Sequence, residues 1–286
     1  MPTAFVEAAG TRIFVREWGR PDASPVVFWH ALGDHTGLQI GEAAPLLAEH
    51  FGLRVLAPDA PGFGESHGLE RIDDYAVEAI GRLATSLLDA LELERAAWVG
   101  ASWGASIGLE AAARSPERVA ALVLLDGGYQ RFEPATLDEI RAGLEEREDE
   151  FRYPSWDALF EDARRYFGRL SPAMENACRS AMREENGQVV SRLGPERYAW
   201  IAYALRRYDA AAAAEAVGRA GVPVLLVAAT HPPESEPDRR RAIARFREAA
   251  PQTQLHDVAA GHAVLEELGA HVADVLGPWL VAQAAE

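Results

Sequence analysis

The first 125 residues alternate short apolar runs with longer amphipathic segments. Alternating apolar and polar positions over Thr11–Trp18 predict a strand with one buried face. Nearly continuous apolar runs are typical of parallel strands that helices cover on both faces, and such runs span Val26–His30, Arg54–Ala57, Ala96–Gly100 and Val119–Leu125. Segments with helical spacing separate them, at Leu38–His50, Tyr75–Leu93 and Trp103–Arg114. The pattern therefore predicts an α/β array in which strands and helices take turns.

A middle block interrupts this alternation. From about Tyr129 to Val217 the pattern fits helices only, with breaks at Pro154, Pro172, Asn186-Gly187 and Pro195. The array then resumes with a strand at Val222–Ala229, a helix at Arg239–Ala249, a strand at Gln254–Val258 and a closing helix at Val264–Ala285. We therefore predict a mostly parallel central sheet flanked by helices. This α/β core takes residues 1–128 and 218–286, and a helical cap, residues 129–217, is inserted between strands.

Composition and charge exclude several classes of protein. The chain has 286 residues, 49% hydrophobic and 25% charged, as expected of a folded globular protein. Its formal charge of −16 repels nucleic-acid phosphates and anionic lipids, so neither partner is expected. No basic leader followed by an apolar run opens the chain, and no apolar stretch reaches the roughly 18 residues that span a bilayer. We expect a cytoplasmic location, and the sequence carries no signal of oligomeric state.

A single cysteine limits the chemistry further. Cys178 has no second thiol with which to form an internal disulfide or a zinc–thiolate site. His30, Asp34 and His35 match part of a metal-ligand pattern but lack a closely spaced His-x-His partner. No metal is therefore predicted.

The strongest local signal is the segment Gly100–Gly104, GASWG, which lies between a predicted strand and a predicted helix. A Gly-x-Ser-x-Gly nucleophile elbow requires this context, because its strained turn lifts the serine hydroxyl above the strand ends. The segment lacks the glycine spacing of a dinucleotide loop and the Lys-Ser or Lys-Thr of a phosphate loop. Ser102 is therefore a candidate nucleophile, and an ordinary glycine-rich turn is the alternative interpretation.

A serine nucleophile needs a general base. Among eight histidines, His262 follows the last predicted strand and precedes the closing helix. This position places it on a loop at the same edge of the sheet as Ser102. A solvent-facing loop histidine is the alternative interpretation.

Four segments together resemble the α/β-hydrolase fold superfamily. They are the elbow, Gly261-His262 near the C-terminus, DAPGFGES at Asp59–Ser66 and HALG at His30–Gly33. The resemblance covers nearly the whole chain outside the cap, and it gives Asp59–Ser66 a structural role. It implies an oxyanion hole formed by the backbone N–H groups of Leu32 and Trp103. Ala31 replaces the usual glycine of this loop, so Ala31 must keep a negative φ.

The acid that orients His262 departs from the commonest family pattern. Most relatives carry an aspartate shortly after the strand that follows the cap, but residues 229–236 contain none. Asp126 ends the strand before the cap, a position that haloalkane dehalogenases can use, and is our candidate. Glu234 and then Glu236 are alternatives, and Asp126 could instead be a strand-end turn residue. The deciding observation is which carboxylate oxygen lies within about 3.2 Å of His262 Nδ1.

These residues imply acyl transfer without a cofactor on a small-molecule carboxylic ester or lactone. Five ring-bearing side chains are the expected pocket lining: His30, Trp103, Trp156, Tyr198 and Trp200. Thioester, amide or C–C bond hydrolysis remains open, as does a cofactor-free lyase or haloperoxidase-like activity. A non-catalytic ligand-binding protein of the same fold is the alternative of another class.

Trp103 also resembles the haloalkane dehalogenases, in which tryptophan follows the nucleophile. Their nucleophile is an aspartate, and the ester that it forms can be cleaved by water at the carboxylate carbon. Ser102 would form an ether without such a route. Dehalogenation and epoxide hydrolysis by that chemistry are therefore excluded.

Overall fold

The computed structural model describes residues 1–147 and 151–284, which fold around an eight-stranded sheet of order β1-β2-β4-β3-β5-β6-β10-β11. Strand β2 pairs antiparallel with β1 and β4, and every pairing from β4 to β11 is parallel. The predicted mostly parallel sheet is confirmed. The strands are β1 (Thr3–Ala8), β2 (Thr11–Trp18), β3 (Ser24–Trp29), β4 (Leu53–Pro58), β5 (Ala96–Ala101), β6 (Val119–Leu125), β10 (Val224–Ala229) and β11 (Gln254–Val258).

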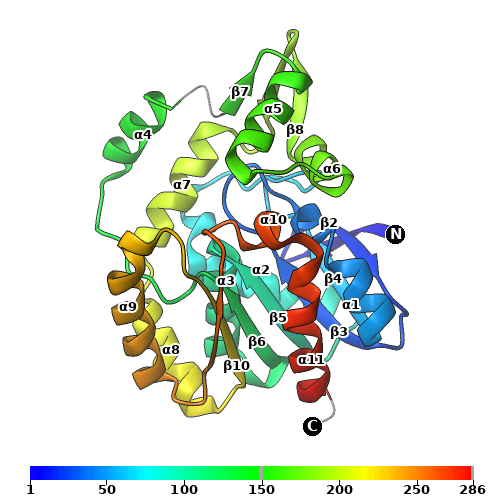
Figure 1. Cartoon of the computed structure of the whole chain (residues 1–286), viewed down its shortest axis with the longest axis vertical. Helices are drawn as coiled ribbons and strands as arrows, with labels where there is room; N and C mark the ends of the chain where they lie inside the picture. Colours follow the sequence, from blue (N-terminus) through cyan, green and yellow to red (C-terminus); the bar gives the residue numbers. More distant parts are fainter. Residues whose placement is uncertain (148–150, 285–286) are drawn as a thin grey trace.

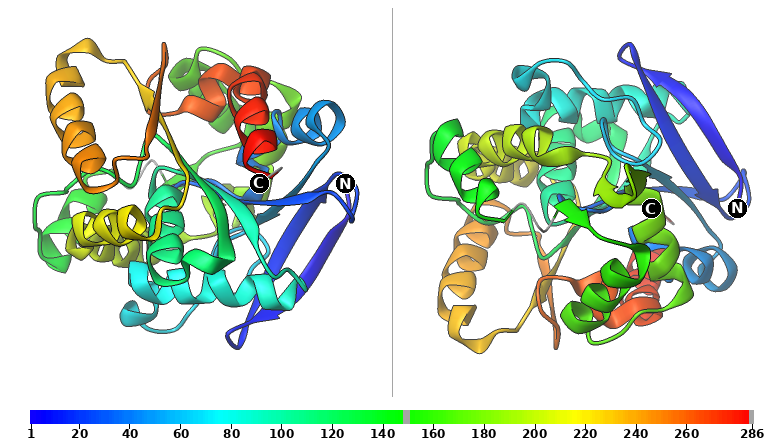
Figure 2. Two further views of the ribbon diagram at one scale, coloured as in Figure 1. Left: turned by 90° about the horizontal axis from the view of Figure 1, so that it is seen from below. Right: turned by 90° about the horizontal axis from the view of Figure 1, so that it is seen from above.

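Helices cover both faces of this twisted sheet (Figures 1 and 2). One apolar cluster joins a face of the sheet to α2, α3, α8 and α9, and a second joins the other face to α1, α10 and α11. No helix in the described ranges is long and apolar enough to cross a bilayer. The helices are α1 (Ala44–Phe51), α2 (Val77–Ala90), α3 (Trp103–Arg114), α8 (Ala210–Ala220), α9 (Glu236–Ala249), α10 (Val264–Leu268) and α11 (Val272–Ala284).

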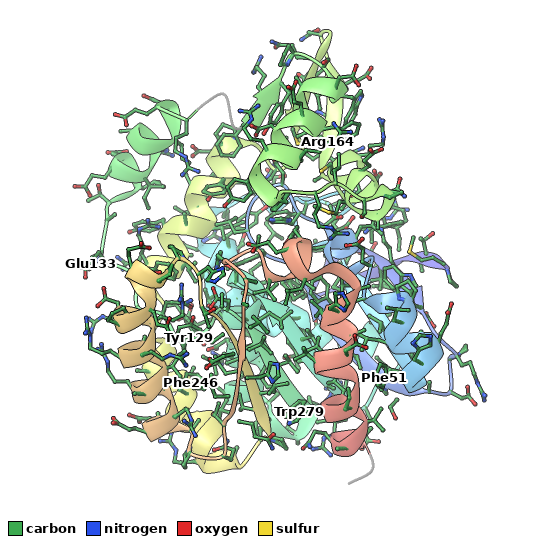
Figure 3. The ribbon with its side chains drawn as sticks, in the orientation of Figure 1. Phe51, Tyr129, Glu133, Arg164, Phe246 and Trp279 are labelled. Atoms are coloured by element: carbon green, nitrogen blue, oxygen red, sulfur yellow. The ribbon has the colours of Figure 1, made fainter. Side chains whose placement is uncertain are left out.

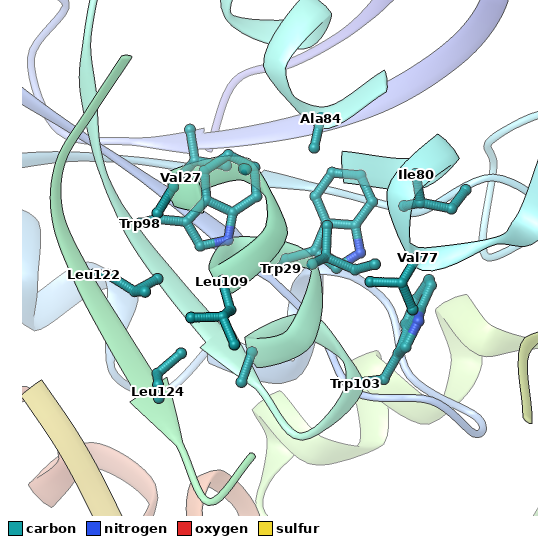
Figure 4. Packing of buried hydrophobic residues seen from close by; sticks show 14 of the residues in the cluster. Val27, Trp29, Val77, Ile80, Ala84, Trp98, Trp103, Leu109, Leu122 and Leu124 are labelled. Carbon is teal, nitrogen blue, oxygen red and sulfur yellow. The ribbon is translucent and has the colours of Figure 1, made fainter. Parts of the chain in front are cut away.

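Three buried tryptophans pack in the first cluster, one of them the first residue of α3 (Figure 4). Trp29 stacks on Trp98 with ring centroids 5.9 Å apart, and it meets the Trp103 ring edge-on at 6.4 Å. Removing one such ring costs about 3–5 kcal/mol in a typical core. On the opposite face, Phe51 of α1 and Trp279 of α11 pack at the margin of the second cluster (Figure 3).

The inserted segment gathers at the end of the core where α10 lies (Figure 1). It contains α4 (Leu137–Glu145), α5 (Trp156–Phe167), α6 (Pro172–Ala181) and α7 (Gly194–Arg207). It also contains an antiparallel sheet of order β7-β9-β8, formed by β7 (Arg152–Tyr153), β8 (Met182–Glu185) and β9 (Gln188–Ser191). The expectation of helices only is therefore wrong for this segment.

The dipeptide Asn186-Gly187 forms the turn of the hairpin between β8 and β9. Asn186 and Gly187 have φ of 51° and 77° and join β8 to β9. Asn-Gly at the centre of a two-residue hairpin supplies the positive φ that the tight turn requires. The dipeptide therefore marks a hairpin and not the expected break between helices.

Three further differences concern element boundaries. Helix α8 crosses the predicted cap boundary at residue 217, but Ala213, Ala214 and Val217 pack in the core cluster. The closing helix divides into α10 and α11 at Gly269, which has a φ of 55°. Strand β1 was not predicted, because only Ala8 of its six residues is buried.

Candidate active site

Ser102 occupies a strained turn between β5 and α3. Its backbone has φ 51° and ψ −111°, a conformation that costs a non-glycine residue on the order of 1–3 kcal/mol. Its N–H donates to the Leu125 carbonyl at 2.9 Å, which ties the turn to the neighbouring strand. A Cβ on Gly100 would lie 2.2 Å from the Gly104 oxygen, and one on Gly104 would lie 2.1 Å from the Trp29 oxygen. The elbow therefore has room for glycine alone at both positions.

His262 lies between Ser102 and Asp126. Its Nε2 is 2.8 Å from Ser102 Oγ, and its Nδ1 is 2.7 Å from Asp126 Oδ2. The ring is on the loop between β11 and α10 and remains 58% exposed. The N–H of the preceding Gly261 donates to Glu267 Oε2 at 2.8 Å, which fixes the loop against α10.

Asp126 follows β6 and is buried, with a φ of 41°. Its Oδ1 accepts hydrogen bonds from Tyr129 Oη at 2.7 Å and from the Ala229 N–H at 3.2 Å, which leaves Oδ2 facing the imidazole of His262. Burial by itself raises the pKa of this carboxyl. The hydrogen bonds from His262 and Tyr129 outweigh burial, so the pKa lies below its usual value. The carboxylate therefore stays ionised at neutral pH.

The two alternative acids lie elsewhere. Glu234 is exposed in a short 3₁₀ turn, Pro233–Ser235. Glu236 begins α9, where its Oε1 accepts two hydrogen bonds from Arg240, at 3.0 and 3.1 Å. The carboxylate oxygen within 3.2 Å of His262 Nδ1 belongs to Asp126.

The loop after β3 brings Leu32 beside Ser102. Both residues line a cavity of about 170 Å³. Five non-glycine residues in the described ranges have a positive φ, and Ala31 is not one of them. Ala31 therefore keeps the negative φ that its place in the loop requires. Its N–H donates to Gln39 Oε1 at 2.8 Å, which holds the loop in place. The backbone N–H of Trp103 is at the first residue of α3, directly after Ser102.

His30 is a buried structural residue and not a pocket residue as expected. Its Nδ1 lies 2.8 Å from the Ala31 carbonyl, and its Nε2 accepts from the Ala60 N–H at 3.0 Å. Burial lowers the pKa of His30 to about 3. Each ring nitrogen therefore has a backbone partner, and the neutral ring holds the β3 loop to the segment that follows β4.

A larger cavity of about 400 Å³ lies between the core and the inserted segment. Tyr198 lines it, as expected, but three other expected lining residues pack elsewhere. Trp103 is buried in the tryptophan cluster, Trp156 stacks on Phe160, and Trp200 packs on Tyr75. The sequence identified aromatic residues, but not the helix faces that they occupy.

Sequence reasoning missed several residues that surround the site. Six residues line both cavities: His35, Gln39, Tyr166, Phe167, Leu265 and Glu266. Glu266 stands four residues after His262 and Tyr129 three residues after Asp126, so proximity to the predicted site residues was an available signal. Within residues 1–147 and 151–284, no group of three His, Cys, Asp or Glu residues could hold a metal ion.

Comparisons with known proteins agree with this architecture. Residues 24–267 match the family model described as the α/β hydrolase fold. The chain is 30% identical over 234 residues to the "Putative non-heme haloperoxidase" of Mycobacterium phage D29, covering 79% of this chain and 77% of that protein. It is 33% identical over 199 residues to the pimeloyl-[acyl-carrier protein] methyl ester esterase of Methylococcus capsulatus, covering 66% and 68%. Two further relatives are matched over 37% and 38% of their own length.

A solved structure shows the same fold. The thioesterase domain from the curacin biosynthetic pathway superposes with a TM-score of 0.76 at 21% identity, covering 99% of each chain. The family match extends over the strands that carry Ser102 and Asp126 and over the loop that carries His262. The chain belongs to the α/β-hydrolase fold family.

Proposed function

We propose that this chain is a serine hydrolase that cleaves a carboxylic ester or lactone through an acyl-enzyme intermediate. The supporting observation is the continuous hydrogen-bonded arrangement of Ser102, His262 and Asp126, with contacts of 2.8 and 2.7 Å. Each residue comes from a different element at the same edge of the sheet. A nucleophile, a base and an orienting acid in this geometry form the working parts of an acyl-transfer enzyme.

In the first half-reaction, Ser102 Oγ attacks the carbonyl carbon while His262 Nε2 accepts its proton. The backbone N–H groups of Leu32 and Trp103 stabilise the oxyanion. Asp126 holds the imidazole through Nδ1 and stabilises its positive charge. The imidazolium then protonates the leaving alkoxide as the C–O bond breaks. Water attacks the acyl-enzyme by the same proton transfers in reverse, which releases the carboxylic acid and restores the Ser102 hydroxyl.

The relatives support an ester substrate and leave one second candidate. The Methylococcus capsulatus relative is named for cleavage of a methyl ester. The phage relative is named as a haloperoxidase, and a cofactor-free activity of that kind would use the same three residues. Product analysis separates the two, because hydrolysis yields one carboxylic acid and one alcohol for each ester consumed.

A panel of esters of increasing acyl length, together with lactones of increasing ring size, tests the proposal. We expect hydrolysis of at least one member, with kcat lowered at least about 10³-fold by Ser102→Ala. Truncating one partly exposed hydroxyl removes little packing, so the variant should keep the wild-type melting temperature. A folded Ser102→Ala protein that retains a tenth of the activity would contradict the assignment.

A further inference from the structure

A polar cluster separates the two cavities beside Ser102. His35, Gln39 and Glu266 line both cavities, and so do Tyr166 and Phe167. Glu266 belongs to α10, which lies below the inserted segment in Figure 1. Any substrate that reaches from Ser102 into the larger cavity must therefore pass this cluster.

Glu266 has one carboxylate oxygen without a partner. The residue is 7% exposed, and its Oε1 accepts from Gln39 Nε2 at 2.9 Å. His35 Nδ1 lies 3.4 Å from the same oxygen. Oε2 is buried and has no hydrogen-bond partner among the residues that the structure describes. A buried acceptor left unpaired costs on the order of 1–3 kcal/mol, which makes this carboxylate the polar group of the boundary most in need of a donor.

Among the residues that the structure describes, the nearest ionisable side chains do not pair with the free oxygen of Glu266. Burial lowers the pKa of His35 despite the opposing effect of Glu266, so the ring is neutral at pH 7. Arg169 bonds both oxygens of the Glu42 carboxylate, each at 2.7 Å, and contacts only the backbone oxygen of Glu266. Arg169 is therefore paired with Glu42 and makes no hydrogen bond to the Glu266 carboxylate. Nearby, burial and the charges of Asp34 and Glu266 raise the pKa of Cys178 to about 11.

We propose that Glu266 is a specificity-determining residue whose carboxylate binds a protonated amine on the substrate. The inference rests on the proposed ester or lactone hydrolysis and names its substrate class, an ester or lactone that carries an ammonium group on the part reaching into the larger cavity. Tyr166 and Phe167 supply aromatic rings at the same boundary, and such rings attract cations. A carboxylate at this point would meet the negative charge of Glu266.

Four esters with one alcohol and acyl chains of equal length test the proposal, the chains ending in ammonium, hydroxyl, methyl or carboxylate. We expect kcat/KM to fall in that order, with ammonium at least about tenfold above methyl. Glu266→Gln should bring the ammonium-to-methyl ratio close to one. It should lower the hydroxyl-to-methyl ratio less, because the amide oxygen still accepts a hydrogen bond. A wild-type enzyme that prefers methyl or carboxylate would overturn the proposal, whether or not the variant folds.

Asp162→Asn is the matched control. Asp162 also lines the larger cavity, but its Oδ2 accepts a hydrogen bond from Tyr153 Oη at 3.3 Å. The substitution removes a carboxylate charge from the same cavity without touching the unpaired oxygen. We expect the ammonium-to-methyl ratio to stay within about twofold of wild type, since the half-exposed charge of Asp162 is screened by water. An equal loss in both variants would assign the preference to the general charge of the cavity and overturn the role of Glu266.

A binding measurement keeps the inference separate from the proposed function. Calorimetry with the Ser102→Ala protein should show hexylammonium binding at least about tenfold more tightly than hexanol, and the added Glu266→Gln should remove the difference. If no ester or lactone is hydrolysed, the proposed function fails while this experiment still tests the amine site. Equal affinity for hexylammonium and hexanol would overturn the inference even in an active esterase.

Discussion

The two oxygens of the Asp126 carboxylate have different partners. Oδ2 lies 2.7 Å from His262 Nδ1, whereas Oδ1 accepts from Tyr129 and the Ala229 backbone. This division fixes the rotation of the carboxylate and, through it, the orientation of the imidazole. The positive φ of Asp126 adds strain that the surrounding strands β6 and β10 support.

Asp126→Asn should lower kcat by up to about 10⁴-fold. The amide keeps the shape of the carboxylate but loses the charge that stabilises the imidazolium and selects its tautomer. Steady-state kinetics on the best ester of the panel measures the effect. Glu234→Gln is the control and should change kcat less than threefold, because Glu234 is exposed in its short turn. The reverse order of the two effects would assign the orienting role to Glu234.

Tyr129→Phe should lower kcat about tenfold and change KM little. The substitution removes one donor from Asp126 Oδ1, which keeps the hydrogen bond from the Ala229 N–H and has Arg239 Nε 4.0 Å away. Because Tyr129 is held against Asp126 and not against the cavities, substrate binding is unaffected. A rise in KM at unchanged kcat would show that Tyr129 acts on the substrate and not through Asp126.

Tyr129→Phe should also change how the free energy of unfolding depends on pH. The folded-state pKa of Asp126 is lowered, so its ionised form stabilises the fold above the ordinary aspartate pKa of about 3.9. That stability is lost as pH falls through the folded-state value. Losing the Tyr129 hydrogen bond raises the folded-state pKa toward the unfolded value, so the variant should lose less stability than wild type as the pH falls. Urea unfolding between pH 7 and 3 measures this, and identical pH profiles for the two proteins would contradict the assignment.

At the level of elements, the elbow depends on how closely α3 approaches β3. Gly104→Ala should destabilise the protein by at least about 2 kcal/mol, since the new Cβ would lie 2.1 Å from the Trp29 backbone oxygen. Gly143→Ala in α4 is the matched control, because nothing lies within 4 Å of its Cβ. It should stabilise by about 0.5–1 kcal/mol through helix propensity. Urea unfolding of both variants is the measurement, and equal effects would contradict this account of the elbow.

The sequence predicted the buried elements best. Strands β5 and β6 read as continuous apolar runs because helices cover both faces, and their ends carry Ser102 and Asp126. The hairpin β8–β9 could also have been found from Asn186-Gly187. Strand β1 could not, because its exposed residues carry little burial pattern. The sequence also could not show which way Trp156 and Trp200 point from their helices. Contacts with Phe160 and with Tyr75, respectively, set these directions.

At the scale of the whole molecule, a few polar contacts join the inserted segment to the core. Arg169, between α5 and α6, donates from both terminal guanidinium nitrogens to the Glu42 carboxylate, each at 2.7 Å. Ser191 Oγ donates to Asp34 Oδ1 at 2.6 Å, and Arg192 lies 3.1 Å from Glu65. Such long-range pairs leave no local pattern in the sequence, which explains why the insertion could be predicted but its seating on the core could not.

Arg169→Gln should loosen this seating. Losing a partly buried pair with two hydrogen bonds costs about 1 kcal/mol, so backbone amides of α6 should exchange with deuterium about fivefold faster. Arg183→Gln is the control, because Arg183 pairs with Glu185 inside the inserted segment. Its effect on α6 exchange should be within experimental error. Equal exchange rates in wild type and Arg169→Gln would show that other contacts hold α6.

The central claim is that Ser102 is a nucleophile activated by His262. Reaction with a fluorophosphonate probe, followed by intact-mass and peptide mass spectrometry, tests it most directly, because an unactivated serine does not react. The account predicts one adduct per chain, located on Ser102, with no adduct on folded Ser102→Ala and strongly slowed labelling in His262→Ala. An unlabelled wild-type protein, or an adduct on a different residue, would contradict it.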